Sequence, residues 1–298
     1  MVDEFIRMLA GRNQFQKRLL QEQELNEEER QGLKNVLAFY MERQGYSLEL
    51  LAEAWYFIND MVMEETYYFV KNGRYRYSAF KEVNEKVYQN AGYMKKYMIG
   101  LAISDYLWVQ HRKIFQWFGK VLESCEKSGD SNGYLEIGPG LGQYLVRALK
   151  SKCFSDYLAV DLSPTSVKQC EEYLSYLGMD KTGYRIQQGD FFGFPAEKQF
   201  DFVVMGEVLE HVEQPETMLE KINSLLSKIG MAFITTVINA PAIDHIYLFH
   251  SKEEVLGMAQ RAGFLVEDYI CVTAGDIPLE KAVKHKFAVD IAMVLRKG

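Results

Sequence analysis

The residues of this 298-residue chain best suited to chemistry are a glycine-rich turn and the acids near it. Residues 134–144 read Tyr-Leu-Glu-Ile-Gly-Pro-Gly-Leu-Gly-Gln-Tyr, an apolar run that carries Glu136 and ends in the turn. Glycines there allow positive φ angles and let a ligand approach the backbone closely. A helical pattern follows, and the N–H groups at its N-terminus have no partner within the helix. The sequence therefore predicts a ligand-binding turn, of a kind that nicotinamide and flavin sites also use.

Two further predicted strands, at 157–160 and around 184–188, are followed by acids. The run 157–160 is followed by Asp161, where an open α/β sheet places the carboxylate that accepts both hydroxyls of a ribose. The run 184–188 is followed by glycine, Asp190 and two phenylalanines. We expect this acid and these aromatic rings to border an adenine.

A fourth predicted strand, 200–205, continues into Gly-Glu-Val-Leu-Glu-His-Val at 206–212. From about residue 130 onward the chain resembles the class I S-adenosylmethionine-dependent methyltransferases, because four of their motifs occur in order at consistent spacing. The motifs are Glu-Ile-Gly-Pro-Gly-Leu-Gly, Val-Asp-Leu-Ser, Gly-Asp-Phe-Phe and Phe-Asp-Phe-Val-Val-Met-Gly-Glu-Val-Leu-Glu-His. A nucleotide-binding dehydrogenase is the alternative, but its fingerprint is G-x-G-x-x-G, whereas the turn here fits G-x-G-x-G.

The resemblance implies a Rossmann-like α/β fold, with a seven-stranded sheet whose last strand is antiparallel to the others. It also implies S-adenosylmethionine as the cofactor. The glycine turn would lie under the methionine end, Asp161 at the ribose, Leu162 beside the adenine and Asp190 at the adenine amino group. The residues expected to bind the cofactor are Glu136, Gly138, Pro139, Gly140, Gly142, Asp161, Leu162, Ser163, Gly189, Asp190, Phe191, Gly206 and Glu207.

The first 129 residues differ in character, since they contain no proline and show apolar residues at helical spacing. We therefore expect an all-helical N-terminal domain at 1–129, a joint at 129–133 and the S-adenosylmethionine-binding domain at 130–298. Predicted helices begin at Asn26 (with Glu29 as capping partner), at Ser47 (ending at Gly73) and at Ser78, and one or two more lie within 93–128.

The helical part is rich in aromatic residues and methionine. Most of these side chains are expected in the core or in a homodimer interface. Some are expected to cover a pocket for an apolar or aromatic acceptor, and Tyr93, Tyr97 and His111 are the residues predicted to bind the substrate.

Composition limits the remaining options. With 48% hydrophobic and 25% charged residues the chain is typical of a soluble globular protein, and a net charge of −7 argues against nucleic acid as a partner. No apolar stretch is long enough to span a membrane, and no secretion signal is recognised. The four scattered cysteines indicate free thiols in a reducing compartment, so we expect a cytoplasmic protein.

Methyl transfer from a sulfonium is a direct displacement, so a base is needed only if the acceptor must lose a proton. His211, His245 and His285 each fall in a segment that leaves or enters the sheet at its carboxyl edge. Three hypotheses remain open for them. His211 is a base, with Glu207, His245 and His285 as further catalytic residues; or the three histidines hold zinc, iron or magnesium; or they merely border the cleft. If residues 207–211 are helical, Glu207, Glu210 and His211 share one face.

The Glu-Val-Leu-Glu-His-Val run is similar to that of ubiquinone-biosynthesis O-methyltransferases. It is also similar to the metal motif of small-RNA 2′-O-methyltransferases, and the architecture is similar to metal-dependent C-methyltransferases of α-keto acids. We predict a methyltransferase acting on a small-molecule acceptor in secondary-metabolite or cofactor biosynthesis. A non-catalytic S-adenosylmethionine-binding partner is the alternative from another class.

Overall fold

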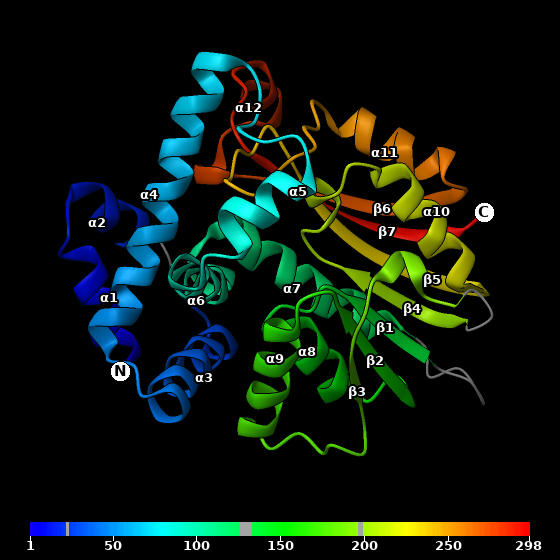
Figure 1. Cartoon of the computed structure of the whole chain (residues 1–298), viewed down its shortest axis with the longest axis horizontal. Helices are drawn as coiled ribbons and strands as arrows, with labels where there is room; N and C mark the ends of the chain where they lie inside the picture. The colour runs from blue at the N-terminus through cyan, green and yellow to red at the C-terminus, as the bar shows by residue number, and fades with distance from the viewer. Residues whose placement is uncertain (22–23, 126–132, 196–198) are drawn as a thin grey trace. The chain divides into compact units, whose positions relative to one another are not determined.

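The structure is a computed structural model that describes residues 1–21, 24–125, 133–195 and 199–298 (Figure 1). The chain forms two compact units. The helical unit comprises Met1–Tyr77, Lys81–Lys113 and Pro241–Asp244, and the sheet unit comprises Ser78–Phe80, Ile114–Ala240 and His245–Gly298. The joint predicted at 129–133 falls largely on residues 126–132, which lie outside the described residues. The domain division at 129/130 therefore stays a prediction.

Every regular element described before residue 126 is helical, as predicted. These elements are α1 (Val2–Ala10), α2 (Gln14–Gln21), α3 (Glu27–Gln44), α4 (Leu48–Asn72), α5 (Phe80–Val83), the π-helical turn η1 (Asn84–Tyr88), α6 (Ala91–Leu107) and α7 (Val109–Ser124). Asn26 and Glu29 form the predicted capping box of α3. Ser47 caps α4, which ends at left-handed Gly73. Among the described helices, none combines the length and the apolar character that a membrane span requires.

The helix predicted to begin at Ser78 begins two residues later, at Phe80. The Phe80 N–H donates to the Glu213 carboxylate at 2.8 Å, so a side chain distant in the sequence takes the place of a local cap. The chain then turns through η1, and the Asn90 side chain caps α6. Ser78 is therefore not the cap that its position in the sequence indicated.

Seven strands form one sheet in the order β3-β2-β1-β4-β5-β7-β6. The strands are β1 (Gly133–Ile137), β2 (Asp156–Asp161), β3 (Arg185–Gln188), β4 (Phe200–Met205), β5 (Leu226–Ile238), β6 (Phe264–Thr273) and β7 (Val289–Lys297). The first five pair in parallel, whereas β7 runs antiparallel to both β5 and β6. The predicted Rossmann-like sheet of a class I methyltransferase is confirmed.

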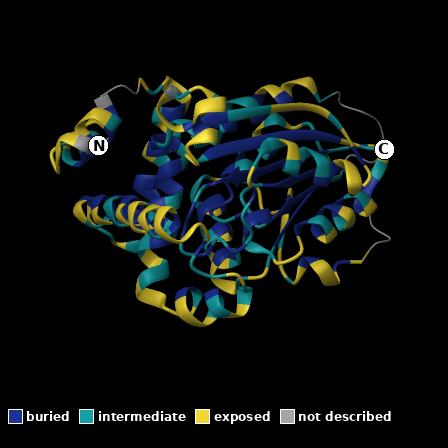
Figure 2. Cartoon of the chain, turned by 90° about the horizontal axis from the view of Figure 1, so that it is seen from above, coloured by how far each residue is buried: buried dark blue, intermediate teal, exposed yellow. Residues whose placement is uncertain are grey.

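Helices and short turns connect these strands. They are α8 (Gln143–Ser151), α9 (Pro164–Tyr176), η2 (Phe191–Gly193), η3 (Leu209–His211), α10 (Pro215–Leu225), α11 (Lys252–Arg261), η4 (Ala274–Asp276) and α12 (Leu279–Lys284). Apolar side chains from α10, α11 and α12 join one hydrophobic core with Ala232 and Ile234 of β5, and the buried strands stand out in Figure 2. These helices therefore cover one face of the sheet.

The opposite face of the sheet is packed with aromatic rings. Phe233 lies between Ala232 and Ile234, so its side chain points to the other side. The Phe118 ring of α7 lies with its centroid 5.0 Å from that of Phe233 and 4.8 Å from that of Tyr144 on α8. Part of the aromatic content of α7 is thus used to hold this helix against the sheet.

Replacing Phe118 with alanine is expected to destabilise the protein by about 3–5 kcal/mol, because it removes a fully buried ring from this face. The measurement is the free energy of unfolding from urea denaturation. Phe287→Ala is the matched control, since that ring is 46% exposed and its removal should change stability by less than about 0.5 kcal/mol. Equal losses for the two variants would contradict the packing described.

Candidate active site

The turn after β1 has the backbone that its glycines predicted. Gly138, Gly140 and Gly142 have φ angles of 65°, 55° and 88°, which favour glycine. A Cβ on Gly142 would lie 2.5 Å from Cys170 Sγ, so this glycine lets α9 pack closely. A Cβ on Gly140 would have no atom within 4 Å. The space in front of Gly140 is therefore open to a ligand, and Pro139 precedes it in the same turn.

Glu136 lies on β1, two residues before the first glycine of this turn, and is buried inside the sheet unit. Its Oε2 accepts a hydrogen bond from the Tyr134 hydroxyl at 2.6 Å. Burial raises the pKa of Glu136 to about 8, although the hydrogen bond from Tyr134 opposes the rise. A cation close to this carboxyl would favour its ionised form.

Asp161 is the last residue of β2, and its side chain is hydrogen-bonded to the glycine turn. Burial raises the pKa of its carboxyl, while hydrogen bonds from the backbone N–H groups of Ser163 and Gly140 lower it in part. The Ser163 N–H lies 2.8 Å from Asp161 Oδ1, and the Ser163 side chain caps α9. Leu162 between them is 55% exposed. A carboxylate held beside Gly140, with an exposed apolar side chain next to it, suits an adenosine.

The segment after β3 contains the acid and the two aromatic residues predicted to border an adenine. The Gly189 N–H donates to the Asp161 carbonyl, and Asp190 Oδ1 accepts from the Phe192 N–H at 3.0 Å. Phe191 is buried in the hydrophobic core, whereas Phe192 is 43% exposed. Of the two aromatic rings, Phe192 is thus the one that can reach a ligand at the surface.

Glu207, which follows Gly206 at the end of β4, does not lie on a helix with Glu210 and His211. Its φ of 52° is left-handed, and η3 begins only at Leu209, so residues 207–211 do not form the helix on which a shared face depended. Glu207 Oε1 accepts from the Thr235 hydroxyl at 2.6 Å. Asn239, which follows β5, has a similar φ of 50°. Such backbone strain in residues other than glycine is concentrated at functional sites.

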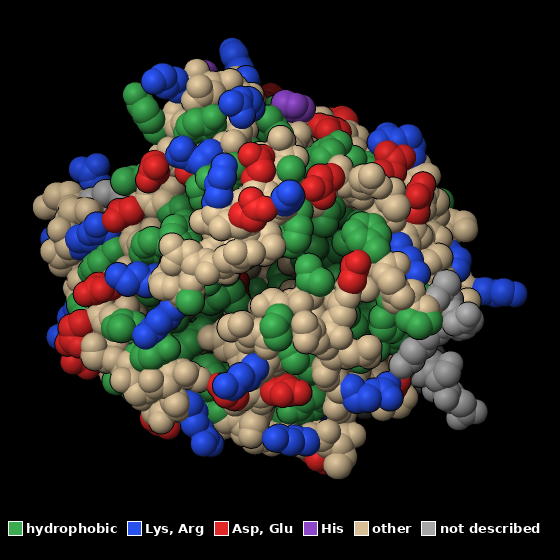
Figure 3. Space-filling model, viewed as in Figure 1, with side chains coloured by type: hydrophobic (Ala, Val, Ile, Leu, Met, Phe, Trp, Pro, Cys, Tyr) green, Lys and Arg blue, Asp and Glu red, His purple; other side chains and the backbone are tan. Residues whose placement is uncertain are grey.

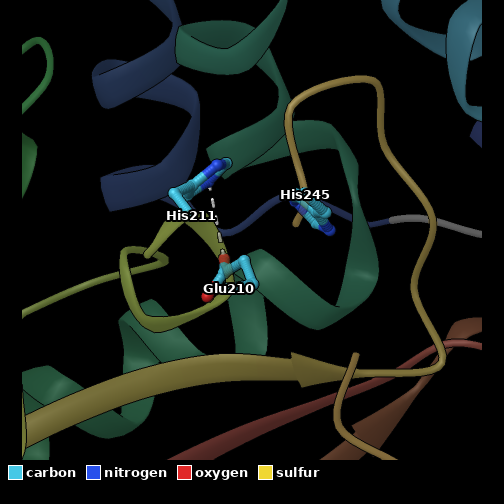
Figure 4. Close-up of side chains that lie close together, drawn as sticks. All are labelled: Glu210, His211 and His245. Carbon is cyan, nitrogen blue, oxygen red and sulfur yellow. Dashed lines mark ion pairs between the residues drawn. The ribbon is translucent and has the colours of Figure 1, made fainter. Parts of the chain in front are cut away.

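Glu210, His211 and His245 form a compact cluster (Figure 4). One ligand atom from each lies within 4.8 Å of the others. His211 Nε2 is 3.8 Å from Glu210 Oε1, and the two imidazole rings are 4.9 Å apart at 83°. Glu210 is fully buried, and its Oε2 accepts from the Thr236 hydroxyl at 2.7 Å.

His245 is oriented by the backbone around it. Its Nδ1 lies 2.6 Å from the Ala240 carbonyl, a contact in which Nδ1–H donates and the ring lone pair is on Nε2. The N–H groups of Ile246 and Tyr247 both donate to the Glu210 carbonyl, at 2.8 and 3.0 Å. The loop after β5 is therefore fastened to the loop after β4.

The other histidines of the second half lie elsewhere. His285 is exposed at the end of α12, where its ring stacks near Phe287, and it is not in the cluster with His211 and His245. His250 is also exposed. The structure thus brings together two of the three predicted metal-binding histidines and adds Glu210. The threonine pair 235–236, in the apolar second half of β5, was a signal for the carboxylates that it contacts, half-buried Glu207 and buried Glu210.

The predicted substrate residues all belong to the helical unit. The Tyr97 hydroxyl donates to both oxygens of Asp244, at 2.7 and 2.8 Å, and burial raises the pKa of this tyrosine well above its usual value. The Tyr93 ring lies 6.1 Å from that of Tyr97. His111 Nδ1 lies 3.1 Å from the Ser104 hydroxyl. Their contact with an acceptor stays a prediction.

Comparison with known proteins finds relatives of part of the sheet unit. Residues 135–232 match the family described as methyltransferase domain. The ubiquinone biosynthesis O-methyltransferase of Xanthomonas euvesicatoria pv. vesicatoria (strain 85-10) is 30% identical over 108 residues, which are 36% of this chain and 44% of that protein. This part of the sheet unit thus resembles the methyltransferase domain over about a third of the chain. The same protein from Xanthomonas axonopodis pv. citri (strain 306) matches equally, so the match spans less than half of these curated relatives.

Solved methyltransferases share the fold of this chain. Mitomycin 7-O-methyltransferase MmcR aligns with a TM-score of 0.56 over 84% of this chain and 70% of its own, at 14% identity. Geranyl diphosphate methyltransferase, solved in complex with SAM, aligns with a TM-score of 0.50 over 76% of this chain and 98% of its own, also at 14% identity. At such identities the likeness shows the class I methyltransferase fold alone.

Replacing Glu136 with glutamine should stabilise the ligand-free protein more at pH 9 than at pH 6. The usual carboxyl pKa of 4.5 is raised to about 8 in the folded protein, which therefore favours the protonated carboxyl. The stabilisation from this group is complete below pH 4.5 and is lost as the pH rises through 8. Glutamine does not ionise and avoids this loss. The measurement is the difference in unfolding temperature between variant and wild type at the two pH values.

Glu171→Gln is the control, because Glu171 is exposed. It should give the same small difference at both pH values. An equally pH-independent result for Glu136→Gln would contradict the raised pKa.

Proposed function

We propose that the protein is an S-adenosylmethionine-dependent methyltransferase that acts on a small-molecule acceptor. The observation that carries this proposal is the pairing of Gly140 with Asp161. The open space at Gly140 gives a ligand access to the backbone, and the Asp161 carboxylate beside it suits the two hydroxyls of a ribose. A nicotinamide cofactor would use the different glycine spacing noted above.

Each part of this cofactor has residues near the turn that are suited to bind it. Asp161 would hold the ribose, Leu162 and Asp190 the adenine, and Glu136 and the glycine turn the cationic methionine end. When bound, S-adenosylmethionine supplies a methyl group already activated by its sulfonium. The protein therefore has to orient the acceptor, exclude water and, for a hydroxyl acceptor, take up a proton.

His211 and His245 are suited to take up that proton from the acceptor. With Nδ1–H donated to Ala240, His245 presents the lone pair of Nε2, and His211 lies against it. The buried Glu210 carboxylate, 3.8 Å from His211 Nε2, would stabilise a protonated imidazole. We therefore assign the base to this pair, with His211 first and Glu210 as the group that stabilises its charge.

A divalent cation is the second candidate for this cluster, because two imidazoles and a carboxylate within 4.8 Å are a ligand set that suits zinc or iron. Magnesium would demand more oxygen ligands than these three side chains offer. When bound, the metal would supply Lewis-acid polarisation of the acceptor oxygen. Glu210, His211 and His245 would hold it, and His285 would not take part.

A small acceptor fits the charges better than RNA does. The net charge is −7, and on the face drawn in Figure 3 basic side chains are interspersed with acidic ones. The likeness to ubiquinone-biosynthesis O-methyltransferases supports an oxygen acceptor in a biosynthetic pathway. C-methylation of an α-keto acid is the other open chemistry. A cytoplasmic location and a homodimer through the helical unit also belong to this proposal.

Asp161→Ala should weaken S-adenosylmethionine binding at least about 100-fold, since two hydrogen bonds to a charged acceptor are lost. Isothermal titration calorimetry measures the affinity. Asp180→Ala is the control, because Asp180 is an exposed acid outside the turn, and it should bind as the wild type does. Equal affinities for the three proteins would overturn the ribose assignment.

Chelation and the cluster variants separate the two histidine roles. If the cluster holds a catalytic metal, the purified protein contains it, chelation abolishes formation of S-adenosylhomocysteine from candidate acceptors, and His245→Ala loses both metal and activity. If His211 is a base, chelation has no effect and His211→Ala lowers kcat by about 100-fold or more. His285→Ala is the control for both, because His285 is exposed and apart from the cluster. Cofactor binding without turnover on any acceptor would favour the non-catalytic alternative.

A further inference from the structure

A tyrosine and a glutamate on β1 form a buried pair within the sheet unit, just before the glycine turn. Tyr134 and Glu136 are two residues apart on the strand, so their side chains lie on the same face of the sheet. Glu136 is 2% exposed, and its Oε2 accepts from the Tyr134 hydroxyl at 2.6 Å. Burial raises the pKa of Glu136 to about 8, against the effect of this hydrogen bond. Among the described side chains, no cation holds the carboxyl in its charged form.

The ring of Tyr134 is held in place by other aromatic rings of the sheet unit. Tyr134 is fully buried. Its ring centroid lies 5.4, 5.6 and 6.1 Å from those of Phe154, Tyr157 and Phe202. A ring packed against three others cannot turn its hydroxyl away without disturbing the core. The hydroxyl therefore restrains one oxygen of the Glu136 carboxyl and leaves the other, Oε1, to a ligand.

Cys170 of α9 shows that this carboxyl lies close to the glycine turn. A Cβ on Gly142 would lie 2.5 Å from Cys170 Sγ, so α9 and the turn are in direct contact. Burial raises the pKa of the Cys170 thiol most, and the charges of Glu136 and Asp161 raise it further. Both acids are therefore near this thiol, and the buried carboxyl and the acid proposed for the ribose border the same turn.

We infer that Tyr134 is a positioning residue that directs the Glu136 carboxylate toward the ammonium group of the cofactor, and that cofactor binding releases the proton of Glu136. The inference rests on the proposed function. An ammonium beside a buried carboxyl favours its charged form, so the proton leaves for the solvent when the cofactor binds. A neutral carboxyl is thereby replaced by a carboxylate paired with the ammonium. The tyrosine hydroxyl stabilises that carboxylate, because hydrogen bonds to charged acceptors are the stronger ones.

The groups around this pair are neutral in the pH range that tests the inference. The titratable groups that interact with Glu136 or with Tyr134 are Cys170 of α9, Tyr144 of α8 and Tyr157 of β2. Burial raises the pKa of Cys170, Tyr134 and Tyr157. These three groups therefore do not ionise between pH 6 and pH 7, and Glu136 is the member of this group of side chains that does so when a cation binds.

The test is calorimetry of S-adenosylmethionine binding at pH 6 and pH 7, in buffers of different ionisation enthalpy so that released protons are counted. An α-amino group has a pKa of about 7.7–8.0, so the cofactor keeps its ammonium over this range. The affinity of the wild type should rise about 10-fold between the two pH values, with close to one proton released, since Glu136 has to ionise. The control ligand is 5′-methylthioadenosine, which has the adenosine but no ammonium. It should release no proton, although Asp161 would hold its ribose as well.

Variants separate the roles of the tyrosine and the glutamate. Tyr134→Phe keeps the ring and should weaken S-adenosylmethionine binding about 10-fold at pH 7, because the charged carboxylate loses its hydrogen bond, while 5′-methylthioadenosine binds as before. Glu136→Gln should abolish the proton release. Tyr157→Phe is the matched control, since its hydroxyl donates to the Ala148 carbonyl and accepts from the Phe154 N–H, and it should bind both ligands as the wild type does.

Two results would overturn the inference and leave the proposed function standing. One is S-adenosylmethionine binding to the wild type without proton release. The other is an equal loss of both ligands in Tyr134→Phe, which a merely structural role of the ring would cause. A wild type that binds no S-adenosylmethionine at either pH would instead refute the proposed function, and the inference with it.

A spectroscopic measurement on the wild type covers the case that Tyr134→Phe does not fold. The NMR signal of the buried Tyr134 hydroxyl proton should move downfield when S-adenosylmethionine binds, because a hydrogen bond to a charged acceptor is shorter. It should not move with 5′-methylthioadenosine. A signal that responds equally to the two ligands, or to neither, would overturn the positioning role.

Discussion

The parallel pairing of β1 with β2 and with β4 is the constraint on which the candidate site depends. Ile137 at the end of β1 lies opposite Val160 of β2 and Met205 of β4. The residues that follow these three, the first turn glycine, Asp161 and Gly206, consequently leave the sheet at the same level. A slip of one residue in either pairing would turn the alternating side chains to the opposite face and separate the carboxylate from the turn. Aromatic packing on one face and aliphatic packing on the other hold that register.

Much of this edge could be predicted from the sequence because its signals are local. A glycine turn after an apolar run and an acid after the next run were sufficient to place Asp161 at the end of a strand. The alternation of strand and helix patterns indicated a parallel sheet, whereas the seven-stranded topology came from the family resemblance of the motifs. Capping signals such as Asn26 with Glu29 are equally local. Ser78 failed as a helix start because Glu213, distant in the chain, takes the role of the cap.

The histidine cluster could be predicted only in part, because its geometry depends on backbone contacts between loops. Spacing alone placed Glu207 and Glu210 on one helical face, but the left-handed backbone at Glu207 turns the two carboxylates to different threonines of β5. His285 lies in a segment between two strands, as the other histidines do. Nothing in its spacing indicated that its side chain would be exposed at the surface. Hydrogen bonds from the Ile246 and Tyr247 N–H groups to the Glu210 carbonyl hold the loop of His245 beside Glu210.

The left-handed residues that follow β4 and β5 set limits on how this edge can change by mutation. Asparagine tolerates this conformation better than glutamate, so the backbone energy stored at Asn239 is smaller than at Glu207. Glycine would relieve the strain at both, but at 207 it would delete a carboxylate, whereas at 239 it would remove an amide. Selection for heat resistance in the laboratory should therefore accept glycine readily at 239. It should reject glycine at 207, where the carboxylate is kept although glutamate disfavours the left-handed conformation.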